Sequence, residues 1–193
     1  MTRLNVSMKN DLVKVLEESS ERNGKTVSSI LSEASQVYVE AEKLGIRITD
    51  VMKGVKLIEI MKQINAVPVP GLLLDRMINI SFRCSQKETS ESWFERGRVL
   101  GNIMKAYAEN MSDFSKFVSD YSVFFPADMF EVNILENRVN VVLSGVGYDQ
   151  QAAICTAEGI SGFLSAYGYG SVNSETSQGF VKVSAEKESS ETP

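Results

Sequence analysis

The sequence predicts an α+β protein: an N-terminal strand and two helices, then a mostly helical segment, then a small antiparallel β-β-α-β-β unit. Three observations predict this order. Apolar residues alternate with period two over residues 3–8, recur every three or four positions up to about residue 125, and alternate again after Pro126. We therefore expect three parts: an N-terminal module over residues 1–45, an α+β domain over residues 46–185, and a flexible tail over residues 186–193.

The composition is that of a soluble globular protein, with 43% hydrophobic and 23% charged residues in a chain of 193. No apolar run approaches the length of a membrane span, and the opening segment MTRLNVSMKN lacks the apolar centre of a secretory signal. We expect a cytoplasmic protein without a membrane partner. The net charge of −5 argues against broad coating of nucleic acid, so any DNA contact must be local.

The chain contains no histidine and only two cysteines, Cys84 and Cys155. Without histidine there is no imidazole base, no Ser-His or Cys-His pair and no imidazole zinc ligand, so we expect neither an enzyme nor a metal site nor a cofactor. The two cysteines lie far apart without C-x-x-C spacing, and we expect both to be buried thiols.

The N-terminal segment Arg-Leu-Asn-Val-Ser-Met at residues 3–8 has the alternation of a half-buried strand. A helix is expected from Asn10, as N-cap, to Arg22, with Gly24 as its stop signal. Thr26 is the expected cap of a second helix that ends at Gly45.

These elements contain too little apolar material for an independent core, and a single strand cannot satisfy its own backbone groups. The module therefore needs a second copy of the chain. The expected dimer core consists of Leu4, Val6, Met8, Leu12, Leu16, Ile30, Leu31 and Ala34.

The rest of the chain is expected to contain helices up to Pro126 and short strands after it. Val67-Pro68-Val69-Pro70-Gly71 interrupts the helical pattern, and Glu136-Asn137 is a two-residue hairpin turn. The expected elements are a helix from Thr49, a helix or buried strand over 72–83, helices over 90–111 and from Ser112, strands over 129–135 and 138–144, a helix over 152–167, and strands over 169–173 and 180–183.

The order R-L-N-V-S-M, helix, N-G-K-T, helix resembles the ribbon-helix-helix family of DNA-binding repressors (Arc-, MetJ- and CopG-like) over residues 2–44. The resemblance implies a dimer whose paired strands form a two-stranded ribbon in the major groove of double-stranded DNA. It further implies a sequence-specific transcriptional regulator, most simply a repressor.

The polar face of the expected strand offers Arg3, Asn5 and Ser7 to base edges, because Arg suits guanine, Asn suits adenine and Ser suits either. In the family, the start of the second helix also presents backbone amides to a DNA phosphate. The residues expected to anchor phosphates are Lys9, Lys25, Thr26, Val27 and Ser28. The module holds six basic against seven acidic residues, so we expect modest affinity per dimer and compensation by several dimers on adjacent sites.

Residues 46–185 carry no recognisable motif, and we expect them to set the oligomeric state or to sense an unidentified small-molecule effector. Gly97 and Gly101, spaced four residues apart, suggest close helix packing. Aromatic residues at helical spacing are expected to be core in preference to a ligand pocket: Trp93, Phe94, Phe114, Phe117, Tyr121, Phe124 and Phe125.

Two other functions remain open at this point. One is an antitoxin-type or other protein-binding dimer, although such proteins usually have short tails that fold on binding. The other is an enzyme in the C-terminal domain, which would need carboxylates such as Asp75, Glu95 or Asp149 to converge in space.

Overall fold

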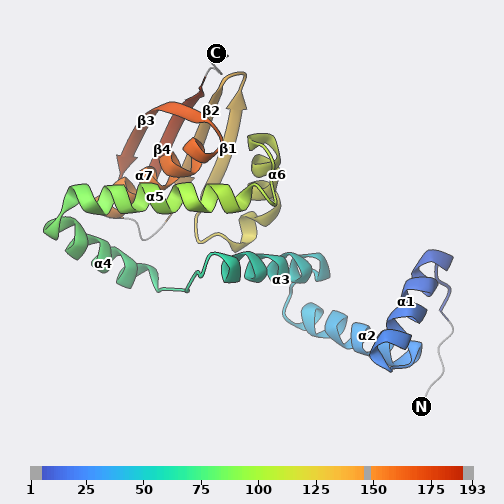
Figure 1. Cartoon of the computed structure of the whole chain (residues 1–193). Coiled ribbons are helices and arrows are strands. Elements are labelled where there is room, and N and C mark those ends of the chain that lie inside the picture. The colour runs from blue at the N-terminus through green and yellow to red at the C-terminus, as the bar shows by residue number, and fades with distance from the viewer. Residues whose placement is uncertain (1–5, 146–148, 189–193) are drawn as a thin grey trace. The chain divides into compact units, whose positions relative to one another are not determined.

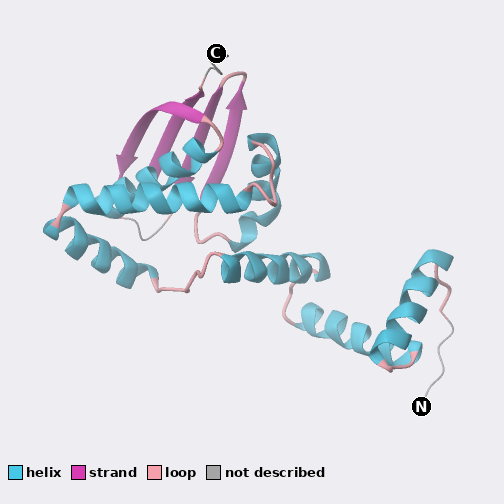
Figure 2. Cartoon of the chain, viewed as in Figure 1, coloured by secondary structure: helices cyan, strands magenta, loops and turns pink. Residues whose placement is uncertain are grey.

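The computed structural model describes residues 6–145 and 149–188 (Figures 1 and 2). The chain divides into two compact units, residues 1–59 and 60–193, and the boundary falls within a helix, α3 (Ile48–Gln63). The sequence places its boundary earlier, at Gly45, so the first unit also includes most of α3.

The N-terminal unit consists of α1 (Asn10–Asn23), α2 (Val27–Lys43) and most of α3. The expected strand-helix-helix order is wrong, because residues 6–9 form no strand and α1 begins at Asn10. Lys9 is extended, with φ −69° and ψ 142°, but a strand also needs a neighbouring strand for its hydrogen bonds, and the described part of this unit contains none. Residues Arg3, Leu4 and Asn5 lie outside the described residues.

Of the two ends of α1, one is as predicted from the sequence and the other is not. Gly24 closes α1 with the left-handed backbone that favours glycine, at φ +62°, as the sequence predicts. Asn10, however, is the first helical residue and not the cap. Lys9 occupies the cap position without a side-chain hydrogen bond, so the start of α1 is the less well-defined end.

The C-terminal unit contains a four-stranded antiparallel sheet in the order β1-β2-β4-β3. The β-β-α-β-β order after Pro126 is as predicted, and Leu135 pairs with Arg138 across the turn at Glu136-Asn137. Its elements are α4 (Gly71–Cys84), α5 (Gln86–Met104), α6 (Met111–Tyr121), a 3₁₀ turn (Ser122–Phe124), β1 (Met129–Leu135), β2 (Arg138–Ser144), α7 (Gln150–Ala166), β3 (Tyr169–Ser177) and β4 (Phe180–Lys187).

Helices cover one face of this sheet (Figure 1). Helix α7 contacts β3 and β4, α6 contacts β1, and α5 packs on α7. On the covered face Val141 pairs with Val132 and Val183, and all three side chains are buried. Ser115 on α6 also donates a hydrogen bond of 2.8 Å to the carbonyl oxygen of Val132. The unit therefore has a hydrophobic core of its own.

Glycines allow α5 and α7 to pack backbone to backbone, which confirms the close packing expected at Gly97 and Gly101. A methyl group on Gly97 would overlap the backbone of Gly159, and one on Gly101 would lie 2.7 Å from the carbonyl oxygen of Phe163. The partner Gly162 on α7 faces the backbone of Phe94 in the same way. Only residues without a side chain fit at these crossing points.

Several local predictions need correction. Residues 72–83, for which the sequence allowed helix or strand, are helical. Helix α5 ends at Met104, short of the expected residue 111, and Asn110 caps α6 in place of Ser112 by accepting a 3.0 Å hydrogen bond from the amide of Asp113. Cys155 is buried as expected, but Cys84 is exposed at the end of α4.

In the part of the chain that the structure describes, no helix combines the length and the apolar character that crossing a membrane requires.

Candidate nucleic-acid interface

The turn between α1 and α2 positions the residues expected to anchor phosphates. Gly24 reverses the chain, and the amide of Lys25 donates a 3.1 Å hydrogen bond to the carbonyl of Ser20. Thr26 follows with an extended backbone, and its hydroxyl accepts a 3.1 Å hydrogen bond from the amide of Ser29. The predicted capping role of Thr26 is confirmed.

The first turn of α2 is accessible from outside. Thr26 and Ser28 are exposed, and Val27 is half-buried. The first amides of a helix have no partner within the helix, so Val27 and Ser28 present donors at the positive end of the helix dipole. This geometry suits an anion such as a DNA phosphate, although the phosphate role itself stays a prediction.

The two flanking lysines differ in their surroundings. Lys9 is exposed immediately before α1. The Nζ atom of Lys25 lies 2.8 Å from a carboxylate oxygen of Glu33, and both side chains are about half exposed. This ion pair is not evident from the sequence, because the partners are eight positions apart, beyond the spacing of neighbours on one helix. Glu33 therefore competes with any phosphate for Lys25.

None of the described residues of the expected dimer core is buried. Val6 is 59% exposed and Leu12 is 51% exposed. Ala34 is exposed, whereas Met8, Leu16, Ile30 and Leu31 are half-buried. Among residues 6–59, Ala41 on α2 is the one buried residue. The helix pair therefore leaves its apolar side chains on its own surface.

The exposed apolar surface also includes residues on the second half of α2 and on α3, which lie outside the expected dimer core. Val37, Tyr38 and Val39 are all exposed on α2, as are Met52 and others on α3. An open depression of about 380 Å³ lies beside them, lined by Tyr38, Glu42, Gly45, Ile46, Arg47, Ile48 and Thr49. At its edge the Arg47 guanidinium pairs with Asp50 at 2.8 Å, and the hydrogen bond and charge of Asp50 raise the pKa of Arg47. The helical spacing of these apolar residues is visible in the sequence, whereas their exposure is not.

The aromatic residues expected in the core are confirmed there in part: Phe114 and Tyr121 are buried, and Phe117 packs against the core cluster. The rings of Phe114 and Phe163 lie 4.5 Å apart, and those of Phe117 and Tyr121 lie 4.3 Å apart. The hydroxyl of Tyr167 donates a 2.8 Å hydrogen bond to the carbonyl of Ala108, and burial, with a contribution from Asp113, raises its pKa to about 12. Residues Trp93, Phe94, Phe124 and Phe125 are half-buried.

Of the three carboxylates considered for catalysis, Asp75 and Asp149 lie close enough to interact, and Glu95 does not join them. Asp149 caps α7 by accepting a 2.8 Å hydrogen bond from the amide of Ala152, and it interacts with Asp75 on α4. Glu95 instead pairs with Arg98 at 2.6 Å. Glu95 also lines an open depression of about 530 Å³ together with Lys87, Ser90, Glu91, Phe94 and Glu158. In the described residues no group of histidine, cysteine or carboxylate side chains has the arrangement of a metal site.

Comparison with known proteins yields no relative: no family model, no curated protein and no solved structure matches the chain. The residues and their geometry must therefore support the function alone.

Proposed function

We propose that this chain is a homodimeric, sequence-specific DNA-binding regulator of transcription. Its N-terminal unit dimerises and contacts DNA, and its C-terminal unit sets the oligomeric state or senses an effector. The observation that carries the proposal is the contrast between the two units. The C-terminal unit has its own core, whereas in the N-terminal unit only Ala41 is buried among residues 6–59.

The exposed apolar residues of α1 and α2 support a dimer. Burial of one such side chain contributes roughly 1.5–3 kcal/mol, and two short helices cannot bury these residues against each other. A second copy supplies the same surface in a two-fold arrangement, the commonest one among soluble oligomers. The stability of this unit then depends on the concentration of the chain.

The start of α2 supports a phosphate contact. Thr26, Val27 and Ser28 lie at an accessible helix N-terminus with Lys25 beside it. In a dimer this feature occurs twice, so two phosphates fix the position of the protein on the duplex. The base-reading roles of Arg3, Asn5 and Ser7 stay predictions, with only Ser7 among the described residues, where it is exposed.

The balance of charge is the feature that favours a second function, a protein-binding dimer of the antitoxin type. Residues 6–45 carry five basic and seven acidic side chains, and Glu33 already neutralises Lys25. A weakly acidic surface of this kind suits a basic protein partner as well as a local DNA contact. Failure of every DNA test below would leave this function as the better one.

Two substitutions of Thr26 test the DNA contact without loss of the helix cap. Both Asp and Ser are good N-cap residues, so Thr26→Asp and Thr26→Ser should leave α2 intact by circular dichroism. The carboxylate of Thr26→Asp repels a phosphate, so DNA binding in a gel-shift assay should fall at least about tenfold, whereas Thr26→Ser should bind as the wild type does. Equal binding by the two variants would contradict the phosphate contact.

A third variant tests the dimer. Leu12→Glu places a charge on the exposed apolar face of α1 and should give monomers by light scattering and abolish DNA binding at the same time. Val123→Glu is the matched control, because Val123 is an exposed valine of the C-terminal unit. A Leu12→Glu protein that is monomeric and still binds DNA would refute the proposed dimer.

A further inference from the structure

Helix α4 is apolar on two opposite sides. On the inner side, Leu74, Ile78 and Phe82 pack in a small cluster with Trp93, Ala152 and Cys155. On the outer side, Leu72 is 84% exposed, Met77 55% and Ile80 56%. A helix with apolar residues on two opposite sides needs a covering element on each side to bury both of them.

The outer apolar residues form a continuous row. Leu73, Met77, Ile80 and Cys84 are all exposed and follow one another at spacings of four, three and four residues. This is the spacing of residues that pack between two paired helices. The exposed apolar residues of α5 and β3, such as Val99 and Val172, are isolated and need no partner.

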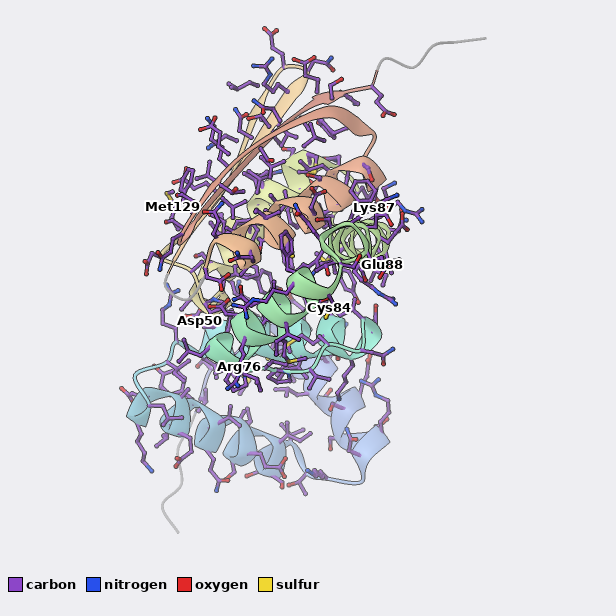
Figure 3. The ribbon with its side chains drawn as sticks, turned by 90° about the vertical axis from the view of Figure 1, so that its left-hand side faces the viewer. Asp50, Arg76, Cys84, Lys87, Glu88 and Met129 are labelled. Carbon is purple, nitrogen blue, oxygen red and sulfur yellow. The ribbon has the colours of Figure 1, made fainter. Side chains whose placement is uncertain are left out.

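The charges beside this row are all positive. Arg76 and Arg83 are exposed on the outer side of α4, whereas Asp75 lies on the inner side, where it interacts with Asp149 on α7. Arg76 and Cys84 are labelled on α4 in Figure 3, where Lys87 and Glu88 mark the first turn of α5. The described outer face of α4 thus carries two arginines and no carboxylate, in a chain whose net charge is −5.

We propose that the outer face of α4 is a docking surface for an amphipathic helix of a partner protein, one that carries carboxylates beside an apolar row. Arginines beside the contact would pair with those carboxylates, and the apolar rows would exclude water. A second copy of α4 is a poorer occupant, because it would bring Arg76 and Arg83 against the same two arginines. Basic amphipathic helices also bind lipid surfaces, and the vesicle measurement below tests that occupant.

Two designed helical peptides of three heptads each test this surface with the full-length chain. Both have leucine at the packing positions. One has glutamate at the flanking positions, and the other has lysine. Fluorescence anisotropy should show the glutamate peptide binding about tenfold more tightly than the lysine peptide. No binding of either peptide, or equal binding of both, would overturn the proposal.

Matched variants separate the apolar contribution from the charges. Arg76→Glu with Arg83→Glu should reverse the preference between the peptides, whereas Arg96→Glu, the same change at an exposed position of α5, should leave it unchanged. Met77→Asn with Ile80→Asn should abolish binding of both peptides, and Val99→Asn should not. Both residues are exposed, so the Met77→Asn/Ile80→Asn variant should remain folded. Its melting temperature checks this.

The other occupants give different results. If the wild-type chain has a larger mass in solution than the Met77→Asn/Ile80→Asn variant, α4 pairs with a second copy and the proposal is wrong. If phosphatidylglycerol vesicles bind the wild type but not this variant, and neither peptide binds, the occupant is a lipid surface and the proposal is equally wrong.

Discussion

Asn79 on α4 donates a hydrogen bond from its side-chain amide to Asp149, the carboxylate that caps the first turn of α7. The other carboxylate oxygen of Asp149 accepts the 2.8 Å hydrogen bond from the amide of Ala152. One side chain thus fixes a helix start and joins it to a helix about 70 residues earlier in the chain. Asp75, one turn before Asn79, faces the same carboxylate and introduces a repulsion.

The surroundings of Asp75 predict a pH-dependent stability. Burial, and then the charge of Asp149, raise the pKa of Asp75 above its ordinary value of 3.8. A raised folded-state pKa means that Asp75 favours folding below pH 3.8 and loses this contribution as the pH rises through the folded value. Asp75→Asn should therefore be more stable than the wild type at pH 7. The difference should shrink as the pH falls toward about 4, the ordinary pKa of an aspartate side chain.

Urea unfolding at several pH values measures this margin. Asp128→Asn, a change at an exposed carboxylate, is the control and should show no comparable gain at pH 7. A gain for Asp75→Asn that stayed constant with pH would contradict the electrostatic explanation.

Two substitutions of Asp149 separate its two roles. Asp149→Ala removes the cap of α7 and the acceptor for Asn79, and should cost about 1–2 kcal/mol in the free energy of unfolding. Asp149→Asn keeps a good cap and removes the charge that faces Asp75, and it replaces the acceptor for Asn79 by an amide donor. Because the cap is kept, its cost should be smaller than that of Asp149→Ala. Denaturant unfolding of the two variants measures both losses in the free energy of unfolding. Equal losses would mean that the cap contributes little.

The contact of α5 with α7 predicts a large effect from a small change. A methyl group at Gly162 would overlap the carbonyl group of Phe94 and lie 3.0 Å from the amide nitrogen of Arg98, so Gly162→Ala forces two backbones apart. We expect a loss of about 3 kcal/mol or more, or failure to fold. Gly71→Ala is the control, because nothing lies within 4 Å of the added methyl group, and it should be neutral or stabilising in thermal unfolding.

The two cysteines should react at very different rates. Cys84 is exposed, whereas burial, with Glu158 and Asp149 nearby, raises the pKa of Cys155 to about 11 and keeps its thiol protonated. Iodoacetamide should modify one thiol per folded chain, and Cys84→Ser should leave none that reacts quickly. Rapid labelling of Cys155 in folded Cys84→Ser protein would show that α4 does not cover α7 as described.

The sequence predicted those features that depend on local patterns. Gly24 and Thr26 are recognisable because a left-handed turn and a helix cap have strong residue preferences, and both occur where expected. The hairpin at Glu136-Asn137 follows from similar local reasons. The spacing of Gly97 and Gly101 predicted a close helix contact but not its partner, α7. The β-β-α-β-β order of the segment after Pro126 could therefore be predicted from the alternation of apolar residues and from the turn residues.

Features that depend on distant partners could not be predicted. The strand expected near Val6 and Met8 has the right alternation, but alternation cannot supply the second strand that its hydrogen bonds require, and residues 6–9 are not paired as a strand. The Lys25–Glu33 ion pair and the exposure of Cys84 depend likewise on how helices lie together. At the candidate site the turn between α1 and α2 could be predicted from the sequence, but the pairing of Glu33 with Lys25, which competes with a phosphate, could not.

The most direct test of the proposed function is selection of DNA fragments from the source genome by the full-length chain, followed by sequencing of the bound fragments. A dimeric regulator that anchors phosphates at both copies of Thr26 should enrich fragments that share two copies of a short half-site in inverted orientation. The Thr26→Asp protein should lose this enrichment. A wild-type chain that enriches no shared sequence, at salt concentrations low enough to retain phosphate contacts, would contradict the account.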